Sequence, residues 1–449
     1  MKKLHRLLTL SLLLVFGVLA LALPFKPSQA ATTIAITSPT ASSTVNGTSF
    51  TVTGTASPSV KVTVKVNSVT VGSTYADTSG NWSLAVTGQA AGAKTIEATA
   101  SGNAIAYVTN RTSETVSMIN TSTNTVSDTF AVGGDASAGT ALNASGTRLA
   151  IFPGTGGDDT VRVFNTATQT LVGSFSANDA LGGVFTPDGS KLYVTESAGN
   201  AVSAWETTNY TQIGSDIAVG AFPTGIAMNP DGGEAYVSNS GAGSISIINT
   251  TSDTVTGDLV TGLSAPAFSV ISSDGDFLYV VSGALSSVYK ININTQAVVS
   301  NIASGTATGL AINSANTTLY GTSAPNDEVA VIDAVNSTSS ASTIGNEPIG
   351  IAVSNDGTKV YVTSAQEDTT IVLDASTMTQ IAGSPIAVGD SPGWIVMGPD
   401  ETATTSVSFT LTNTLLADTG LNRQAITTAA LFMTLLGGAI VVRRLKFSR

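Results

Sequence analysis

One short stretch of sequence recurs along the chain and decides the fold. Its copies begin at an aromatic or small apolar residue and read Tyr107-Val108-Thr109-Asn110, Ala150-Ile151-Phe152, Tyr193-Val194-Thr195, Tyr236-Val237-Ser238-Asn239, Tyr279-Val280-Val281, Tyr320-Gly321-Thr322 and Tyr361-Val362-Thr363. Successive copies start 43 or 41 residues apart. A fixed period of this length indicates an array of similar supersecondary units.

Each unit reads as four short strands. In the unit around Tyr236, a first strand at Gly225–Met228 ends in the turn Asn229-Pro230-Asp231-Gly232. The strand with the tyrosine follows, then an alternating strand at Ile245–Asn249 and a fourth strand after a polar turn. Alternating apolar and β-branched residues between such turns are typical of antiparallel strands. Four strands in 40–45 residues form the blade of a β-propeller, so we expect an all-β chain.

The two ends of the repeat region predict how the ring closes. The region opens with a second strand, Ile105–Asn110, and closes with a lone first strand, Gly393–Met397. If these two strands share one blade, residues 102–401 form a seven-bladed β-propeller without an open sheet edge. A solenoid built from the same repeat would need capping ends, which the sequence does not show.

The repeats resemble the YVTN family of seven-bladed β-propellers, named for the motif at Tyr107–Asn110. That resemblance implies a surface protein with a binding or scaffold role. Related oxidoreductases carry metal or quinone cofactors held by His or Cys, whereas this chain has no Cys and a single His, His5. We therefore expect no enzyme and no cofactor, with Ca²⁺ as the one ion that the acidic side chains could hold.

Residues 31–100 lack the repeat and show short alternating strands, such as Val60–Val64 and Lys94–Ala98. With the Gly80-Asn81-Trp82 turn, they resemble bacterial immunoglobulin-like modules, which implies a small β-sandwich with Trp82 as its core aromatic residue. Such modules are spacers or adhesive tips. Residues 402–415 are interpreted as a short linker.

Both chain ends carry targeting patterns. Residues 1–30 combine a basic start, an apolar run and a small-residue cleavage site, which is typical of a secretory signal peptide. Residues 425–442 are uncharged and long enough for a transmembrane helix, and a basic tail follows them. Before that helix stands Leu416-Ala417-Asp418-Thr419-Gly420. The order of motif, apolar helix and basic tail over residues 416–449 resembles an LPxTG-like sortase sorting signal, which implies cleavage after Thr419 and attachment to cell-wall peptidoglycan. The alternative is that the helix stays as a membrane anchor.

The charge excludes some partners. The chain has 449 residues and a formal net charge of −12, and all 30 acidic residues lie between the two basic ends. Such a body repels nucleic acid and suits cations, basic partners or neutral ligands. The absence of Cys, and of any His outside the signal peptide, excludes thiolate sites, His-liganded metals and Ser-His-Asp triads.

Acidic residues concentrate on the loops that one face of the propeller would carry, namely those joining second to third strands and each fourth strand to the next blade. Three acidic pairs stand out as a candidate binding face: Asp158 and Asp159, Asp327 and Glu328, Glu367 and Asp368. Hard cations prefer several oxygen ligands, so these pairs could hold Ca²⁺. The alternative is that they only keep an exported protein soluble. The Asp-Gly turns at Asp188, Asp231, Asp274 and Asp356 match hairpin turns better than calcium loops, and Trp394, near the channel mouth, is interpreted as a packing residue.

These observations predict a secreted, surface-anchored protein that binds an extracellular glycan, protein or cation, with sortase and the wall as partners in its anchoring. Two alternatives stay open. One is a structural component of the cell envelope, and the other is a calcium-dependent, lactonase-like hydrolase that activates water with oxygen ligands alone.

Overall fold

The computed structural model describes residues 33–57, 60–77, 79–101, 104–136, 138–154, 158–305, 308–400 and 402–412. The predicted signal peptide, sorting signal and transmembrane helix lie outside these residues. Across the described part of the chain, no helix is long and apolar enough to span a bilayer. Only one helical turn occurs there, the 3-10 turn η1 (Ala324–Asn326). The described chain is therefore all-β, as the sequence predicts.

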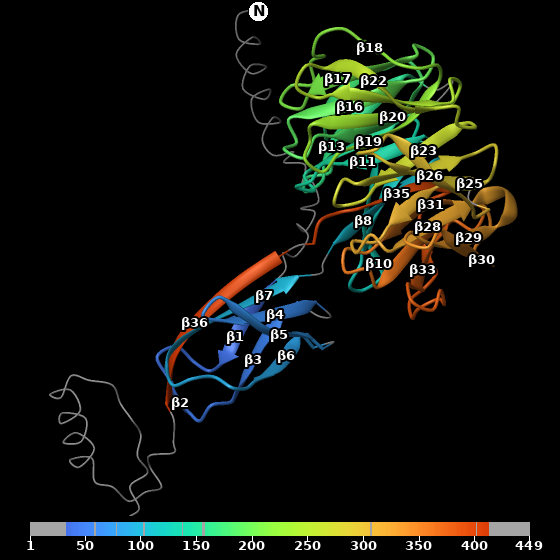
Figure 1. Ribbon diagram of the computed structural model, residues 1–449. Coiled ribbons are helices and arrows are strands. Elements are labelled where there is room, and N and C mark those ends of the chain that lie inside the picture. The colour runs from blue at the N-terminus through green and yellow to red at the C-terminus, as the bar shows by residue number, and fades with distance from the viewer. Residues whose placement is uncertain are drawn as a thin grey trace, which may run out of the picture. The chain divides into compact units, whose positions relative to one another are not determined.

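Residues 104–400 form seven four-stranded antiparallel sheets (Figure 1). The first sheet has the order β10 (Thr125–Ala131), β9 (Thr115–Asn120), β8 (Ile105–Asn110), β35 (Pro392–Met397). The second to fourth sheets consist of β11 (Gly139–Leu142), β12 (Arg148–Phe152), β13 (Thr160–Asn165), β14 (Thr170–Ser176); β15 (Ala180–Phe185), β16 (Lys191–Glu196), β17 (Ala201–Glu206), β18 (Ile217–Ala218); and β19 (Pro223–Met228), β20 (Glu234–Asn239), β21 (Ser244–Asn249), β22 (Thr254–Thr261). The fifth to seventh consist of β23 (Pro266–Ile271), β24 (Phe277–Ser282), β25 (Ser287–Asn292), β26 (Ala297–Ala303); β27 (Leu310–Ile312), β28 (Thr318–Ser323), β29 (Glu328–Asp333), β30 (Thr338–Thr343); and β31 (Pro348–Val353), β32 (Lys359–Ser364), β33 (Thr369–Asp374), β34 (Ile386–Ala387).

The first strands of the seven sheets contact one another in a closed cycle, from β35 through β11, β15, β19, β23, β27 and β31 back to β35. The first sheet draws strands from both ends of this region, because β35 pairs antiparallel with β8. The predicted sharing of one sheet by Ile105–Asn110 and the late strand is thus confirmed. We call one side of this ring the loop face: it carries the loops that join second to third strands and fourth strands to the next first strand.

The repeated motif is explained by contacts between neighbouring sheets. The hydroxyl of Thr363 accepts a hydrogen bond from the Gly350 N–H of its own sheet (2.8 Å) and donates to the Gly393 carbonyl of the next sheet (2.6 Å). Thr322 makes the equivalent pair with Gly309 (2.8 Å) and Ile349 (2.7 Å). The motif threonine therefore ties the first strands of adjacent sheets together.

The motif tyrosine ties the outer parts of adjacent sheets together. Tyr361 is fully buried, and its hydroxyl donates to the Asn124 side chain in the first sheet (3.0 Å). Tyr193 donates in the same way to Asp253, which also binds Lys191 (2.8 Å). Burial, followed by this carboxylate contact, raises the pKa of Tyr193, so the phenol stays protonated and remains a donor.

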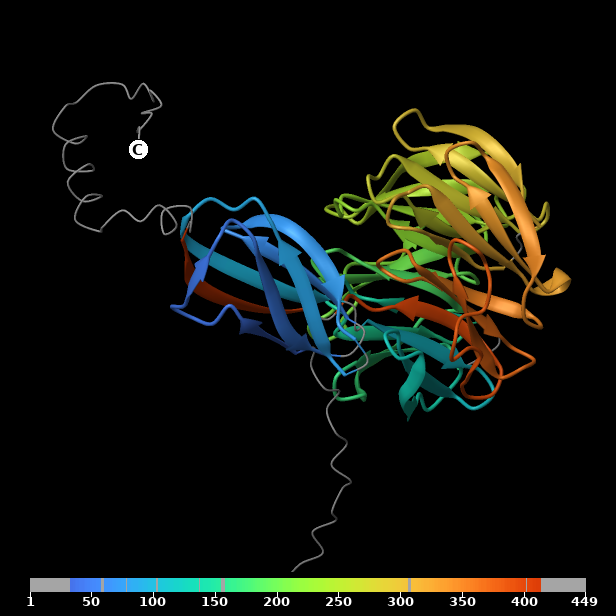
Figure 2. The ribbon, with the colours of Figure 1, turned by 90° about the horizontal axis from the view of Figure 1, so that it is seen from below.

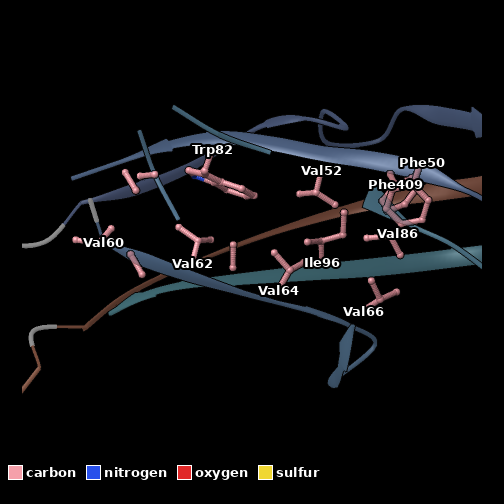
Figure 3. Packing of buried hydrophobic residues seen from close by; sticks show 14 of the residues in the cluster. Phe50, Val52, Val60, Val62, Val64, Val66, Trp82, Val86, Ile96 and Phe409 are labelled. Atoms are coloured by element: carbon pink, nitrogen blue, oxygen red, sulfur yellow. The ribbon is translucent and has the colours of Figure 1, made fainter. Parts of the chain in front are cut away.

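Residues 33–101 form a β-sandwich, but not by themselves. One sheet has the order β1 (Ile34–Ser38), β3 (Phe50–Ala56), β6 (Asn81–Val86). The other has the order β2 (Thr44–Asn46), β36 (Thr402–Thr412), β7 (Gly92–Ser101), β4 (Lys61–Val66), β5 (Val69–Tyr75). Trp82 is 3% exposed in the core between the sheets, which confirms its predicted role (Figure 3).

The linker predicted for residues 402–415 is wrong over its first eleven residues. The segment Thr402–Thr412 is strand β36, which pairs antiparallel with β7 along ten residues and parallel with β2 along three. Figure 1 shows this red strand lying along β7. Its side chains alternate, and Phe409 and Leu411 are buried in the sandwich core. This alternation favours a strand, and the burial of two large apolar residues stabilises it.

The sandwich is therefore a discontinuous domain, and the seven-sheet region is inserted between its strands β7 and β36. Figure 2 gives a second view in which the blue N-terminal strands and the red C-terminal strand belong to one module.

Candidate functional site

Three of the six predicted acidic residues act as structural acceptors on the loop face. Asp159, Asp327 and Asp368 each precede a third strand with a positive φ of 48°, 53° and 54°. Their carboxylates accept hydrogen bonds from the backbone N–H of Asp179 (3.2 Å), Glu347 (2.8 Å) and Ser391 (2.8 Å), respectively. Asn200 does the same for the N–H of Phe222 (2.8 Å). Asp and Asn suit this left-handed corner because a short polar side chain can bond locally.

The other three predicted acids have different surroundings. Asp158 forms an ion pair with Arg162, and that guanidinium holds the pKa of Asp158 below its usual value. Glu367 is exposed and accepts a hydrogen bond from the Ser364 hydroxyl (3.0 Å). Glu328 is half-buried at the start of β29.

The six acids lie in the second, sixth and seventh sheets, and they do not meet at one point. Nowhere in the described ranges do three or more Asp, Glu or His side chains group so that they could hold a metal ion. The carboxylates that sequence reasoning assigned to ligand binding are thus partly engaged in loop structure. The missed signal was positional, because an Asp or Asn recurs directly before the third strand.

The Asp-Gly turns lie at the opposite edge and are structural, as predicted. Asp188 accepts hydrogen bonds from the Thr186 hydroxyl (2.6 Å) and the Ser190 N–H (3.0 Å). The first of these bonds is the main cause of the lowered pKa of Asp188. Asp274 and Asp356 make equivalent bonds within their turns.

Two aromatic rings meet at the centre of the ring of first strands. Phe268 on β23 and Trp394 on β35 have ring centroids 4.3 Å apart, although their sheets are not neighbours in the cycle. Both residues are the third of their strands and half-buried. The corresponding residue of β19 is Gly225, where a Cβ atom would lie 2.7 Å from the Ala267 carbonyl oxygen. Glycine thus lets first strands approach, whereas the two aromatic side chains fill the centre.

Trp394, which the sequence placed near the channel mouth, is a packing residue as predicted, but the sequence did not identify Phe268 as its partner. The available signal was that Phe and Trp stand where the first strands β15, β19 and β31 carry Gly182, Gly225 and Gly350.

The loop face divides into an acidic and an uncharged part. Glu114, Glu367, Asp368 and Asp390 are all exposed on loops of the first and seventh sheets. The loop that follows β34 contacts the loop between β8 and β9, because the Asp390 N–H donates a hydrogen bond to the Ser113 hydroxyl (3.0 Å).

The loops near the fourth and fifth sheets carry no charge and expose apolar side chains. Phe222 is 46% exposed and Leu285 is 51% exposed. Arg111, the one base in the sequence of these loops, donates from the loop between β8 and β9 to the Ser391 hydroxyl in the loop between β34 and β35 (2.9 Å).

Glu196 is a buried acid at the fourth position of a motif copy, where two other copies have Asn and three have Ser. The side-chain amide of Asn239 at this position donates to the hydroxyls of Ser244 (3.1 Å) and Ser246 (2.9 Å). Glu196 is 4% exposed, and burial raises its pKa. Its carboxylate accepts a bond from the Asn178 N–H (3.4 Å), which only partly offsets that burial.

Comparison with known families matches residues 33–98 to the family described as Bacterial Ig domain. The sandwich strands up to β7 are therefore similar to that family, and β36 lies beyond the matched residues. No curated protein matches the chain.

Three solved structures resemble the fold. A candidate 6-phosphogluconolactonase from Bacteroides uniformis is 14% identical with a TM-score of 0.56, covering 66% of this chain and 99% of that chain. A second, from Bacteroides fragilis, is 15% identical with a TM-score of 0.54, covering 66% and 98%. A chain of Kuenenia stuttgartiensis hydrazine synthase is 20% identical with a TM-score of 0.52, covering 58% and 88%. At these identities the likeness concerns the fold alone, which resembles the β-propellers of the lactonase type.

Proposed function

We propose that this chain is an exported binding protein attached to the cell surface through its C-terminal end, and that its seven sheets are the blades of a β-propeller of the YVTN type. The observation that carries the proposal is strand β36. The chain leaves the ring at Met397, re-enters the sandwich at Thr402, and reaches Leu416 of the sorting motif four residues after Thr412.

This connectivity makes the sandwich the domain nearest the attachment point, and the propeller the domain that is displayed. A Bacterial Ig domain supports an extracellular surface location, because such domains are typical of surface proteins. The sorting motif and apolar helix then supply the attachment, with sortase and peptidoglycan as the partners.

The loop face is the proposed recognition surface. Its exposed acids on the first and seventh sheets suit a basic partner or a cation, and its exposed Phe222 and Leu285 suit apolar contact. Phe268 and Trp394 close the centre between these two regions. The ligand classes are an extracellular glycan, a protein or a cation.

A lactonase-like hydrolase is the second candidate, favoured by the fold likeness to the two Bacteroides structures. Its chemistry would need a metal held by oxygen ligands, since the exported chain would contain no His. A structural envelope component is the third, and self-assembly of the purified protein into arrays would support it.

A thermal-shift screen of the exported chain tests the main proposal. The panel holds Ca²⁺, wall glycans, basic peptides and lactones, and a ligand present at a hundred times its Kd stabilises the folded state by about 2.7 kcal/mol. A shift with a glycan, peptide or cation that is lost in a Glu367→Gln, Asp390→Asn double variant supports recognition at the loop face. Turnover of a lactone supports the hydrolase instead, and no shift with any ligand contradicts the recognition role.

A further inference from the structure

Every residue from Thr402 to Thr412, in the segment that joins the propeller to the chain's C-terminal end, belongs to one strand of the sandwich. In an array of consecutive domains this segment would be an exposed linker, which is where proteases cut most readily. Here it lies between β7 and β2 instead.

Backbone bonds hold β36 on both edges near its C-terminal half. The Ser42 N–H donates to the Ser408 carbonyl (2.9 Å), and the Thr410 N–H donates to the Ser43 carbonyl (2.9 Å). Beyond the strand's last residue pair, the Gly47 N–H donates to the Thr412 carbonyl (2.7 Å).

Side chains add to this hold. Phe409 is 3% exposed and meets Phe50 edge to face, with ring centroids 5.1 Å apart (Figure 3). Hydroxyl pairs link β36 to β7, as between Thr404 and Thr99 (3.0 Å). A protease needs an extended segment free of such partners, so it can reach β36 only after the sandwich opens.

We propose that the N-terminal immunoglobulin-like module is a lock on the tether: while it stays folded, the propeller cannot be cut from the C-terminal end of the chain at residues 402–412. The lock also resists pulling. Tension between the propeller and residue 413 runs along β36, which is already extended over about 35 Å, so opening the sandwich lengthens the tether little.

The inference rests on the proposed function only in taking the C-terminal end as the attached one. Its test uses the purified full chain in solution, so a failure of the lock leaves the attachment proposal standing. Chymotrypsin cleaves after large apolar residues, and within β36 it would cut after Phe409 and Leu411. New chain ends at these residues are identified by mass spectrometry.

Three variants separate the lock from general instability. Val64→Ala removes two fully buried methyl groups from sandwich strand β4, and Ile96→Val removes one methyl group from β7. Val194→Ala is the matched control, a fully buried valine on β16 of the ring. Cleavage through an opened state tracks the population of that state. We expect cutting after Phe409 to accelerate roughly two- to tenfold in Ile96→Val and tenfold or more in Val64→Ala, with no change in Val194→Ala.

Hydrogen exchange of the β36 amides provides the second readout, since it requires no cleavage, and it should follow the same order of variants. The lock is overturned if chymotrypsin cuts the unaltered chain after Phe409 as fast as it cuts the urea-unfolded chain. It is equally overturned if β36 exchange and cleavage stay unchanged in a Val64→Ala protein whose sandwich melts at a lower temperature.

Discussion

Replacing Thr363 by valine should destabilise the closed ring more than a Thr→Val replacement at an exposed position does. The Thr363 hydroxyl is fully buried and joins the seventh sheet to the first through Gly350 and Gly393. Valine has nearly the same shape, and the motif already has Val281 at this position in the fifth sheet, so the volume is tolerated.

The magnitude follows from the two groups that lose their partner. The Gly350 N–H and the Gly393 carbonyl would each stay buried without this bond, and an unsatisfied buried group costs about 1–3 kcal/mol. We therefore expect Thr363→Val to lower the free energy of unfolding by about 2–6 kcal/mol. For a region of this size that corresponds to a fall in Tm of roughly 4–10 °C.

Urea denaturation followed by tryptophan fluorescence measures this loss, with Thr343→Val on exposed strand β30 as the control. The control should change the free energy of unfolding by less than about 0.5 kcal/mol. A loss in Thr363→Val below about 1 kcal/mol, or equal to that of the control, would show that the bridging hydroxyl does not stabilise the ring.

Three further variants test other parts of the account. Glu196→Gln should stabilise the protein near neutral pH, because burial raises the pKa of Glu196 and the native protein loses stability as the pH rises through that raised value. Denaturation measured at several pH values should show that the gain in stability vanishes below the ordinary pKa of 4.5. Asp327→Asn should change the free energy of unfolding by less than about 0.5 kcal/mol, because the amide oxygen still accepts the hydrogen bond from the Glu347 N–H. Asp327→Ala removes this acceptor and should lower the free energy of unfolding by about 0.5–2 kcal/mol. Equal losses in the two variants would show that the negative charge, and not the acceptor oxygen, stabilises the loop. Trp394→Ala should lower the free energy of unfolding by about 1–3 kcal/mol by calorimetry, since the half-buried ring loses its contact with Phe268, and an unchanged melting curve would contradict that packing role.

The period of the repeat predicted most of the ring because its information is local. Each tyrosine strand stands between its own turns, so Ile105–Asn110 and the late strand could be placed as partners by counting strands alone. The bridging role of the motif threonine was not predicted, because it depends on the distance between strands of different sheets. That distance is set by packing at glycines such as Gly350 and by nothing in the motif itself.

The role of β36 was missed for a different reason. The sequence does show alternating apolar residues at Val407, Phe409 and Leu411. However, the segment contains no charged residue and no turn signal that would mark it as a strand, and it follows the last repeat directly. Its partner Gly92–Ser101 lies about three hundred residues earlier, and local patterns carry no record of such a pairing.

The candidate site shows the limit of counting charges. Five of the six acidic residues lie on loops, as expected, and Glu328 begins β29. Three of them, Asp159, Asp327 and Asp368, accept backbone hydrogen bonds at left-handed corners. Residue type alone does not distinguish such an acceptor from a ligand-binding carboxylate. The exposed Glu367 and Asp390 stay the acids on which the proposed recognition rests.

The most direct test of the central claim is mass spectrometry of the protein released from the native cell wall by a wall-degrading enzyme. An exported, sorted protein begins at Ala31 and ends at Thr419 joined to a peptidoglycan fragment, and that is the predicted result. A chain that still begins at Met1 and ends at Arg449, recovered from the cytoplasmic fraction, would contradict both export and attachment.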